Sequence, residues 1–208
     1  MEIIRKYFPN LSSEQAAQIE QLGTLYVSWN QQINVISRKD IDHLFLHHIL
    51  HSLAVAKFLT FQPNAQILDL GTGGGLPGIP LAILFPETQF TLIDARSKKM
   101  IVVADLVEQL GLKNVTYLHG RAEELKTRYD FVLARAVASI DKLNLWAMPL
   151  IHNKHKHALP NGLIAFKGGN IDEELKTLPR RAYYEVISIN AFFPEAYFNE
   201  KHLVYVQK

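Results

Sequence analysis

The feature that most constrains this fold is a glycine-rich loop that directly follows a short apolar run. Residues 67–78 read ILDLGTGGGLPG. Glycines let the backbone turn sharply after a strand and approach a ligand closely, because they have no Cβ atom. A helix that begins at the end of such a loop offers free backbone N–H groups to polar atoms of the ligand. The segment therefore predicts a strand, a ligand-binding loop and a helix in direct succession.

Short apolar runs alternate with helical stretches around and beyond this loop. Strands are expected at Gln66–Leu70, Gln89–Asp94, Val115–His119, Asp130–Ala134 and Leu163–Lys167, and helices near Leu81–Phe85, Lys98–Leu110, Arg121–Leu125 and Ile140–Leu150. This alternation is typical of a parallel sheet with helices on both faces. The runs Tyr184–Phe192 and His202–Gln207 leave no room for a crossover helix, so we expect an antiparallel hairpin at the end of the chain.

The first 62 residues follow a different, helical pattern. Ser12–Gln15 carries a capping signal, and apolar residues follow it at helical spacing. A second helical pattern runs from about Asp40 to Leu59, and Phe61–Asn64 then marks a break in the chain. The sequence therefore predicts a helical lobe at 1–62, packed on a ligand-binding domain at 63–208.

Composition excludes several classes of site. The 208 residues include no cysteine, which excludes disulfides, Cys-ligated zinc, iron–sulfur clusters and a thiolate nucleophile. No apolar run approaches 18 residues, and the first residues lack the order of a signal peptide, so we expect a soluble cytoplasmic domain without a membrane partner. The 22 Lys and Arg nearly balance the 20 Asp and Glu, so any nucleic-acid face must be a local patch.

Two cofactors compete for the glycine loop. Residues 73–78 match the GxGxxG dinucleotide fingerprint, and Asp94 lies at about the right distance to bind a ribose hydroxyl. Residues 71–75, read as GxGxG, instead resemble motif I of the S-adenosylmethionine (SAM)-dependent methyltransferases. Asp69 precedes this motif by two residues, as in the methyltransferase pattern, and the expected C-terminal hairpin also resembles their sheet. The sequence therefore favours SAM over NAD.

Missing motifs narrow the class of methyl transfer. Cytosine C5 methylation typically needs a cysteine, and methylation of exocyclic amines often uses an Asn/Asp-Pro-Pro-aromatic motif where this chain has Ala134–Val137. Lys167 keeps oxygen methylation open, because it could act as a base. A ring nitrogen such as guanine N7 has a free lone pair and needs only positioning, which Arg135 and Lys167 at strand ends could provide.

Several segments together resemble the glucose-inhibited division protein B family, bacterial methyltransferases that modify guanine N7 in small-subunit (16S) ribosomal RNA. The glycine loop with LPGIP at 76–80 is the most specific, and it is joined by WN at 29–30, HHILHS at 47–52, FTLID at 90–94, RAEE at 121–124, RAVAS at 135–139 and FKG at 166–168. The resemblance spans nearly the whole chain. It implies an α/β, Rossmann-like class I SAM-dependent methyltransferase fold: a mostly parallel seven-stranded sheet with an antiparallel C-terminal hairpin and an N-terminal helical extension.

The resemblance also implies a set of site residues. SAM is expected on Gly71, Gly73, Gly75, Leu76, Asp94, Ala122, Glu123 and Arg135, with Asp94 at the ribose. The RNA-facing candidates are Asn34, Arg38, His47, His48 and Lys167. Among them, His48 and Lys167 are candidates for positioning the substrate, and we expect neither a general base nor a metal ion. The expected partner is small-subunit RNA within a ribonucleoprotein particle, with the target in the decoding-region 530 loop, and not DNA.

The chain departs from the family pattern in its loop and in its second helix. Gly74 stands where the family usually has proline, and His47 and His51 stand where it usually has Arg and Asp. His43, His47 and His51 are spaced four residues apart, which places them on one helical face. We expect this face to be a solvated or RNA-facing stripe rather than a metal site.

Overall fold

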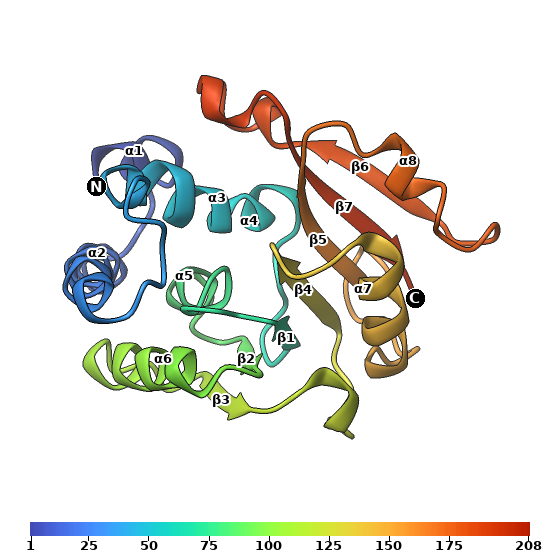
Figure 1. The fold of residues 1–208 in the computed structure, drawn as a ribbon, viewed down its shortest axis with the longest axis horizontal. Helices are drawn as coiled ribbons and strands as arrows, with labels where there is room; N and C mark the ends of the chain where they lie inside the picture. The colour runs from blue at the N-terminus through green and yellow to red at the C-terminus, as the bar shows by residue number, and fades with distance from the viewer.

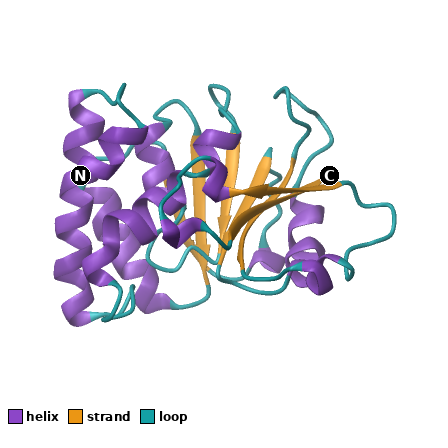
Figure 2. Ribbon diagram, turned by 90° about the horizontal axis from the view of Figure 1, so that it is seen from above, coloured by secondary structure: helices purple, strands orange, loops and turns teal.

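The computed structural model describes all 208 residues, Met1–Lys208, as a central sheet between two layers of helices (Figure 1, Figure 2). The strands are β1 (Gln66–Leu70), β2 (Gln89–Asp94), β3 (Val115–His119), β4 (Phe131–Arg135), β5 (Gly162–Gly168), β6 (Tyr184–Ser188) and β7 (Lys201–Gln207). Their order across the sheet is β3-β2-β1-β4-β5-β7-β6. The first five strands pair in parallel, and β7 is antiparallel to both β5 and β6. The expected parallel sheet and antiparallel C-terminal hairpin are confirmed.

Helices cover both faces of this sheet, as Figure 1 shows. One layer contains α1 (Glu2–Tyr7), α2 (Ser13–Gln32), α3 (His51–Leu53), α4 (Val55–Phe58), α5 (Gly78–Leu84) and α6 (Ser97–Gln109), and the other contains α7 (Ile140–Ala147) and α8 (Asp172–Leu175). No helix combines the length and the apolar character that crossing a membrane requires.

Side chains alternate between the two cores along each strand, because successive residues of a strand point to opposite faces. In β4, Phe131 and Leu133 belong to the larger core, which also contains residues of α2, α5 and α6. Val132 and Ala134 belong to the smaller core, under α7. This alternation directs Arg135, the next residue, toward the N-terminal helices.

The N-terminal helices share the larger core with the sheet. Ile4, Ile19 and Tyr26 are fully buried in the same cluster as Phe131. The expected capping box is confirmed: the Ser12 hydroxyl accepts from the Gln15 backbone N–H, and the Gln15 side chain accepts from the Ser12 N–H. The helices are thus packed on the core as expected, whereas a domain boundary at residue 62 stays a prediction.

The structure differs from the sequence prediction mainly in short helices. The expected helix at Asp40–Leu59 is divided into a 3-10 turn (Ile41–His43), a π-helical segment (Leu44–Leu50), α3 and α4. The helix expected at Arg121–Leu125 is only a 3-10 turn, Ala122–Glu124. The helices α1 and α8 were not predicted, because six and four residues are too few to show a helical period.

Candidate functional site

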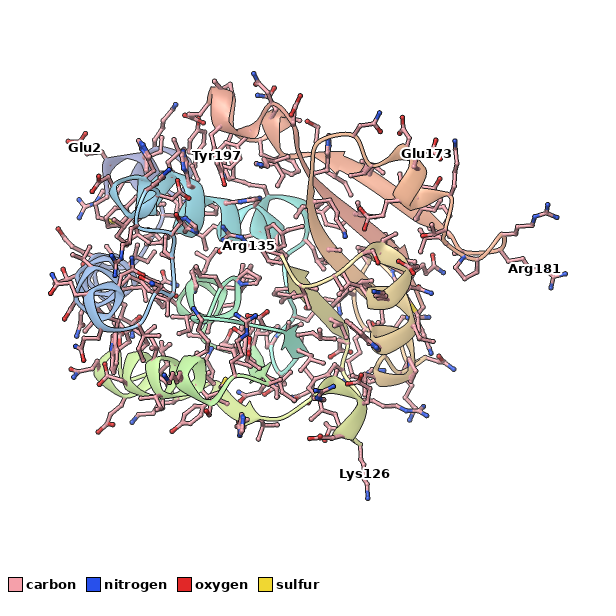
Figure 3. All side chains as sticks on the ribbon, in the orientation of Figure 1. Glu2, Lys126, Arg135, Glu173, Arg181 and Tyr197 are labelled. Atoms are coloured by element: carbon pink, nitrogen blue, oxygen red, sulfur yellow. The ribbon has the colours of Figure 1, made fainter.

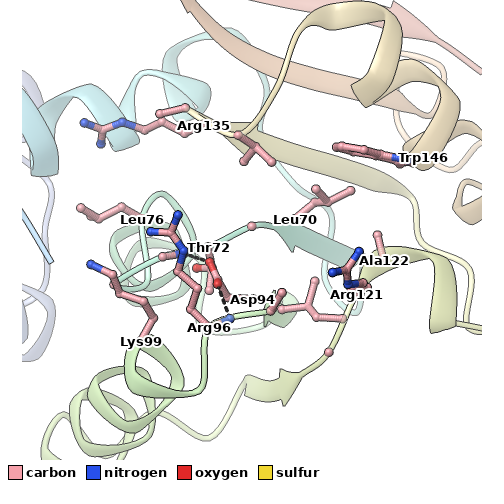
Figure 4. Close-up of a pocket in the computed structure, with 18 of the residues that line it drawn as sticks. Leu70, Thr72, Leu76, Asp94, Arg96, Lys99, Arg121, Ala122, Arg135 and Trp146 are labelled. Carbon is pink, nitrogen blue, oxygen red and sulfur yellow. Dashed lines mark hydrogen bonds between the residues drawn. The ribbon is translucent and has the colours of Figure 1, made fainter.

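A cavity of about 510 Å³ opens at the carboxyl ends of β1, β2 and β4 (Figure 4). Its wall includes the glycine loop, the end of β2, the turn after β3 and the end of β4, together with Val35, His48 and Trp146 from other segments. Ligands of open α/β sheets bind at this edge of the sheet. The volume lies within the range of roughly 300–1,000 Å³ that is usual for small-molecule sites.

The glycine loop reaches the cavity through backbone conformations that favour glycine. Gly71, Gly73 and Gly75 have φ values of +70°, +58° and +95°. A Cβ atom on Gly71 would lie 2.7 Å from a methyl group of Val137, whereas one on Gly73 would meet nothing within 4 Å. Gly71 and Gly73 line the cavity, as predicted. Gly75 does not; a Cβ there would lie 2.4 Å from Ile79, so this glycine instead lets the loop pack on the start of α5.

Asp69 stabilises the glycine loop through hydrogen bonds to its carboxyl group. Its fully buried carboxyl accepts from the Thr72 hydroxyl at 2.6 Å and from the Gly78 N–H at 2.8 Å. Its other oxygen, Oδ1, has no hydrogen-bond partner. Burial raises the pKa of Asp69 to about 7, although these two hydrogen bonds oppose the shift. The acidic residue that precedes the motif therefore organises the loop rather than lining the cavity.

Asp94 ends β2 and faces the same cavity. Its Oδ2 accepts from the Gly73 N–H at 2.9 Å, and its Oδ1 accepts from the Arg96 N–H at 2.8 Å (Figure 4). Each carboxylate oxygen can accept more than one hydrogen bond, so Asp94 can also accept from hydroxyl groups of a ligand. The loop and the predicted ribose-binding residue are thus joined by a hydrogen bond.

The far end of the cavity is mostly apolar. Leu70, Ile93 and Ala122 line it. In Figure 4 the Trp146 side chain of α7 lies above Leu70 and Ala122. Glu123 follows Ala122 in the lining. An apolar slot with an aromatic wall suits a flat, weakly polar ring.

Three cations line the rim: Arg96, Lys99 and Arg121. Burial, and then the charge of Arg96, lowers the pKa of Lys99.

Neither these three cations nor Trp146, Thr72 and Val137 were predicted as site residues. Arg96 and Lys99 could have been found, because they follow Asp94 at the start of the next helix. Trp146 carried no such signal, because only the packing of α7 brings it over the cavity.

Arg135, whose place in the whole molecule is labelled in Figure 3, lines the cavity, but its guanidinium group turns toward the π-helical segment and α3 (Figure 4). Nη1 donates to the His48 carbonyl and to the Ser52 hydroxyl, both at 3.1 Å. Nη2 donates to the His47 carbonyl at 3.0 Å and to His48 Nδ1 at 3.1 Å. Both carbonyl groups belong to the π-helical segment. Such irregular turns are frequent at functional sites.

His47 and His48 both bind one carboxylate. His47 Nδ1 lies 2.5 Å from Asp40 Oδ1, and His48 Nε2 lies 2.6 Å from Asp40 Oδ2. His48 lines the cavity, whereas His47 does not. Burial, and then the charge of Arg135, lowers the pKa of His48 to about 4. His48 is therefore neutral at neutral pH.

The structure does not bring Lys167 into the cavity. Arg135 pairs with Phe166 in the β4–β5 register, so Lys167, the next residue, points to the opposite face of the sheet. Its ammonium group donates to the Ala138 carbonyl at 2.8 Å and forms an ion pair with Glu174 of α8. The sequence predicted the strand end correctly, but the alternation along β5 separates this side chain from Arg135.

Asn34 and Arg38 are exposed beside the cavity without lining it. The Lys99 ammonium group donates to the Asn34 carbonyl at 2.5 Å. Asn30 Oδ1 accepts from the Val35 and Ile36 N–H groups, both at 2.9 Å, which holds Val35 in the wall of the cavity. The segment after α2 therefore forms part of the site mainly through Val35.

The expected histidine stripe is wrong at its third member. His43 is exposed and stacks on His47, but His51 is only 5% exposed and packs against Phe166 and Phe198. Burial, and then Arg135, holds the pKa of His51 well below its usual value. The sequence could not show this, because the aromatic residues that cover His51 come from β5 and from the loop between β6 and β7.

Comparison with known families agrees with this geometry. The family model for the rRNA small subunit methyltransferase G, GidB, matches residues 15–204. The chain belongs to the GidB family. Two curated members are proteins named Ribosomal RNA small subunit methyltransferase G. The Phocaeicola vulgatus protein is 50% identical over 206 residues, which are 99% of this chain and 98% of the relative. The Bacteroides thetaiotaomicron protein is 50% identical over 207 residues, which are 100% of both.

Solved structures place this GidB-family chain in the class I SAM-dependent methyltransferase fold. M. jannaschii TYW2 in complex with AdoMet aligns with a TM-score of 0.57 and 15% identity, covering 85% of this chain and 77% of that one. A SAM-dependent methyltransferase from Aquifex aeolicus aligns with a TM-score of 0.52 and 16% identity, covering 74% and 88%. The predicted fold class is confirmed.

The cavity of this GidB-family chain fits SAM as its cofactor. The glycine loop approaches it with backbone rather than side chains, and Gly73 leaves open space where a Cβ would stand. Asp94 provides a carboxylate for hydroxyl groups, and Trp146 with Ala122 provides an apolar slot. The donors, acceptors and apolar surface that a nucleoside cofactor requires are therefore present.

Proposed function

We propose that this chain transfers a methyl group from SAM to N7 of a guanine in 16S ribosomal RNA, in the decoding-region 530 loop. One coincidence carries the proposal: the segment that matches the GidB family, residues 15–204, contains the cavity that the glycine loop and Asp94 line. The relatives named above are small-subunit ribosomal RNA methyltransferases by name, which supports the RNA substrate.

We assign cofactor binding to residues of the cavity wall. Gly71, Gly73 and Leu76 face the cofactor through the loop, and Asp94 accepts from its ribose hydroxyls; Ala122 and Glu123 line the adenine end, and Arg135 lines the wall nearest the N-terminal helices. SAM supplies an electrophilic methyl group on its sulfonium centre. Gly75 supports this site by shaping the loop rather than by lining the cavity.

The residues near the reaction act by positioning. Guanine N7 carries a free lone pair, so no proton has to be removed before it attacks. His48 stays neutral and hydrogen-bonded, and Arg135 donates four hydrogen bonds to the adjacent helix, so both residues fix the wall. We expect a rate without a sharp single-group optimum near neutral pH; a steep ionisation assigned to one residue would contradict this mechanism.

The RNA has to present its target outside a regular helix. Guanine N7 faces the deep major groove of A-form RNA, which side chains reach poorly, so the base must be splayed or flipped. Asn34, Arg38, His47, His48 and Lys167 remain our candidates for the RNA face, although only His48 lines the cavity. With a net charge of only +2, the chain is expected to depend on a preassembled ribonucleoprotein particle for part of its binding surface.

The decisive test is transfer of labelled methyl from SAM to small ribosomal subunits that lack base methylation, followed by nucleoside analysis. We expect label in 7-methylguanosine, located in the 530 loop by primer extension, and faster transfer to particles than to protein-free RNA. The variant Asp94→Ala should abolish transfer, whereas the control Asp42→Ala, an exposed carboxylate outside the cavity, should not. Tight SAM binding without label in any nucleoside would instead indicate a non-catalytic role in subunit assembly.

A further inference from the structure

Asp40 lies at the centre of a side-chain network that reaches the cavity without lining it. Its two carboxylate oxygens bind two neighbouring histidines, His47 at 2.5 Å and His48 at 2.6 Å. The Asp40 side chain is 33% exposed, whereas those of His47 and His48 are 17% and 14% exposed. A carboxylate at the edge of the molecule thus anchors two largely buried imidazoles.

The partners of His48 permit only one tautomer. A guanidinium group can donate hydrogen bonds but cannot accept them, so His48 Nδ1 must accept from Arg135. An ionised carboxylate can only accept, so His48 Nε2 must carry the proton that it donates to Asp40. The two contacts are compatible only because they use opposite nitrogens of a neutral ring.

The ionisation of both groups agrees with this arrangement. Burial, followed by the charge of Arg135, keeps the pKa of His48 at about 4, so the ring is neutral. Burial alone would raise the pKa of Asp40, but the hydrogen bonds from His47 and His48 outweigh it and place the pKa below its usual value. Asp40 is therefore the acceptor at neutral pH.

The second oxygen of Asp40 extends the network to the C-terminal hairpin. The His47 ring that it holds stacks on Tyr197 with ring centroids 3.7 Å apart and planes 10° apart. The Tyr197 hydroxyl donates to the His47 carbonyl at 3.1 Å, and Arg135 donates to the same carbonyl. Asp40 thus joins the loop after α2, the π-helical segment, and the loop between β6 and β7.

We propose that Asp40 is a positioning residue for methyl transfer, which acts by fixing the tautomer of His48 so that Nδ1 accepts from Arg135. Asp40 thereby sets the wall of the cavity that contains Arg135 and faces the N-terminal helices, while the glycine loop and Asp94 form the opposite wall. This inference rests on the proposed function. It predicts that the loss of Asp40 slows transfer more than it weakens SAM binding.

The first test compares Asp40→Asn with the control Asp42→Asn, which neutralises an exposed carboxylate two residues away. In the wild type, side-chain ¹⁵N NMR at neutral pH should show His48 protonated at Nε2 and unprotonated at Nδ1. The neutral amide of Asp40→Asn accepts more weakly than a carboxylate, so the His48 ring can turn away from Arg135 and the signal should shift toward a mixture of tautomers. The variant should lower kcat at least tenfold, with the Kd for SAM changed less than threefold. Asp42→Asn should change none of these.

A double-mutant cycle separates positioning from general destabilisation. His48→Asn keeps an acceptor near Arg135 but is too short to reach Asp40, so adding Asp40→Asn to it should lower kcat little further. Fully additive losses, an unchanged His48 tautomer in Asp40→Asn, or wild-type kcat in that variant would each overturn the inference. If wild-type protein methylated no particle, the proposed function would fail, and the His48 NMR signal would still decide whether Asp40 sets the tautomer.

Discussion

The cavity has two walls that are built in different ways. The cofactor wall consists mainly of the glycine loop, residues 71–76, joined to Asp94 by a hydrogen bond across 21 residues of sequence. The opposite wall consists of side chains that meet across long separations: Arg135 binds the His48 carbonyl 87 residues away, and Tyr197 binds the His47 carbonyl 150 residues away.

This difference separates two kinds of requirement on the sequence. The cofactor wall depends on backbone conformations that few residue types adopt, so glycine is required at particular positions, each for its own backbone conformation. The opposite wall depends on a chain of donors and acceptors, so each member matters through its partners. A substitution in the cofactor wall should therefore weaken SAM binding directly. A substitution in the opposite wall should act through the residues that are hydrogen-bonded to the one replaced.

The largest expected effect is on the glycine loop. Gly71→Ala places a Cβ 2.7 Å from Val137 at a φ of +70°. The control Gly111→Ala has a similar φ of +64° but open space around it. Both variants should lose roughly 1–2 kcal/mol of unfolding free energy to the left-handed backbone. Only Gly71→Ala should also weaken SAM binding, by tenfold or more in titration calorimetry; equal Kd values in both variants would contradict the steric role of Gly71.

The next effect is a pH dependence of stability that arises from Asp69. Burial raises its folded-state pKa to about 7, above the ordinary value of an unfolded chain. The folded state therefore binds this proton more tightly, so the contribution of Asp69 to stability is fully present below about pH 4 and is lost as pH rises through about 7, by up to about 1.4 kcal/mol per pH unit. Urea unfolding of wild type and Asp69→Asn from pH 4 to 8 measures this. A stability difference that stays constant with pH would count against it.

A smaller effect on SAM binding is expected at Trp146, which belongs to the cofactor wall but lies far from the glycine loop in the sequence. Trp146→Ala removes the aromatic side chain that α7 contributes to the cavity. We expect the Kd for SAM to rise about tenfold, because an aromatic contact of about 0.5–1.5 kcal/mol is lost along with apolar surface. Trp146→Phe should restore most of the affinity. The adjacent Leu145, which is 70% exposed and outside the cavity, provides the control Leu145→Ala, expected to bind SAM normally.

The smallest effect should come from a single hydroxyl group of the opposite wall. Tyr197→Phe removes the hydrogen bond to the His47 carbonyl but keeps the ring that stacks on His47. We expect a loss of about 1 kcal/mol in unfolding free energy and no change in SAM binding. Tyr183→Phe, which removes an exposed hydroxyl bonded to Glu185, should change stability less. Weaker SAM binding in Tyr197→Phe would mean that the two walls are coupled.

Most of the sheet could be predicted from the sequence. The bounds of β1, β2 and β3 agree with the predicted ranges, because each strand is a short apolar or β-branched run that follows a turn. The expected end of β6 at Phe192 was wrong, since the strand stops at Ser188 and a 3-10 turn follows. Ile189 lies in this turn and is fully buried, so burial of an apolar run does not require a strand.

Some residues of the site could be predicted from the sequence and others could not. The sequence by itself determined the glycine loop, Asp94 and the edge of the sheet where a ligand binds, because these depend on backbone geometry within short segments. Only the tertiary structure decided that Lys167 faces away from the cavity, that His51 is buried, and that Asp40 holds two histidines. His51 is covered by aromatic residues that lie more than a hundred positions away in the sequence, and no local pattern encodes such a partner. Lys167 and Asp40 have partners within eight residues, but the strand register and the irregular turns that bring these partners together form only when the chain packs.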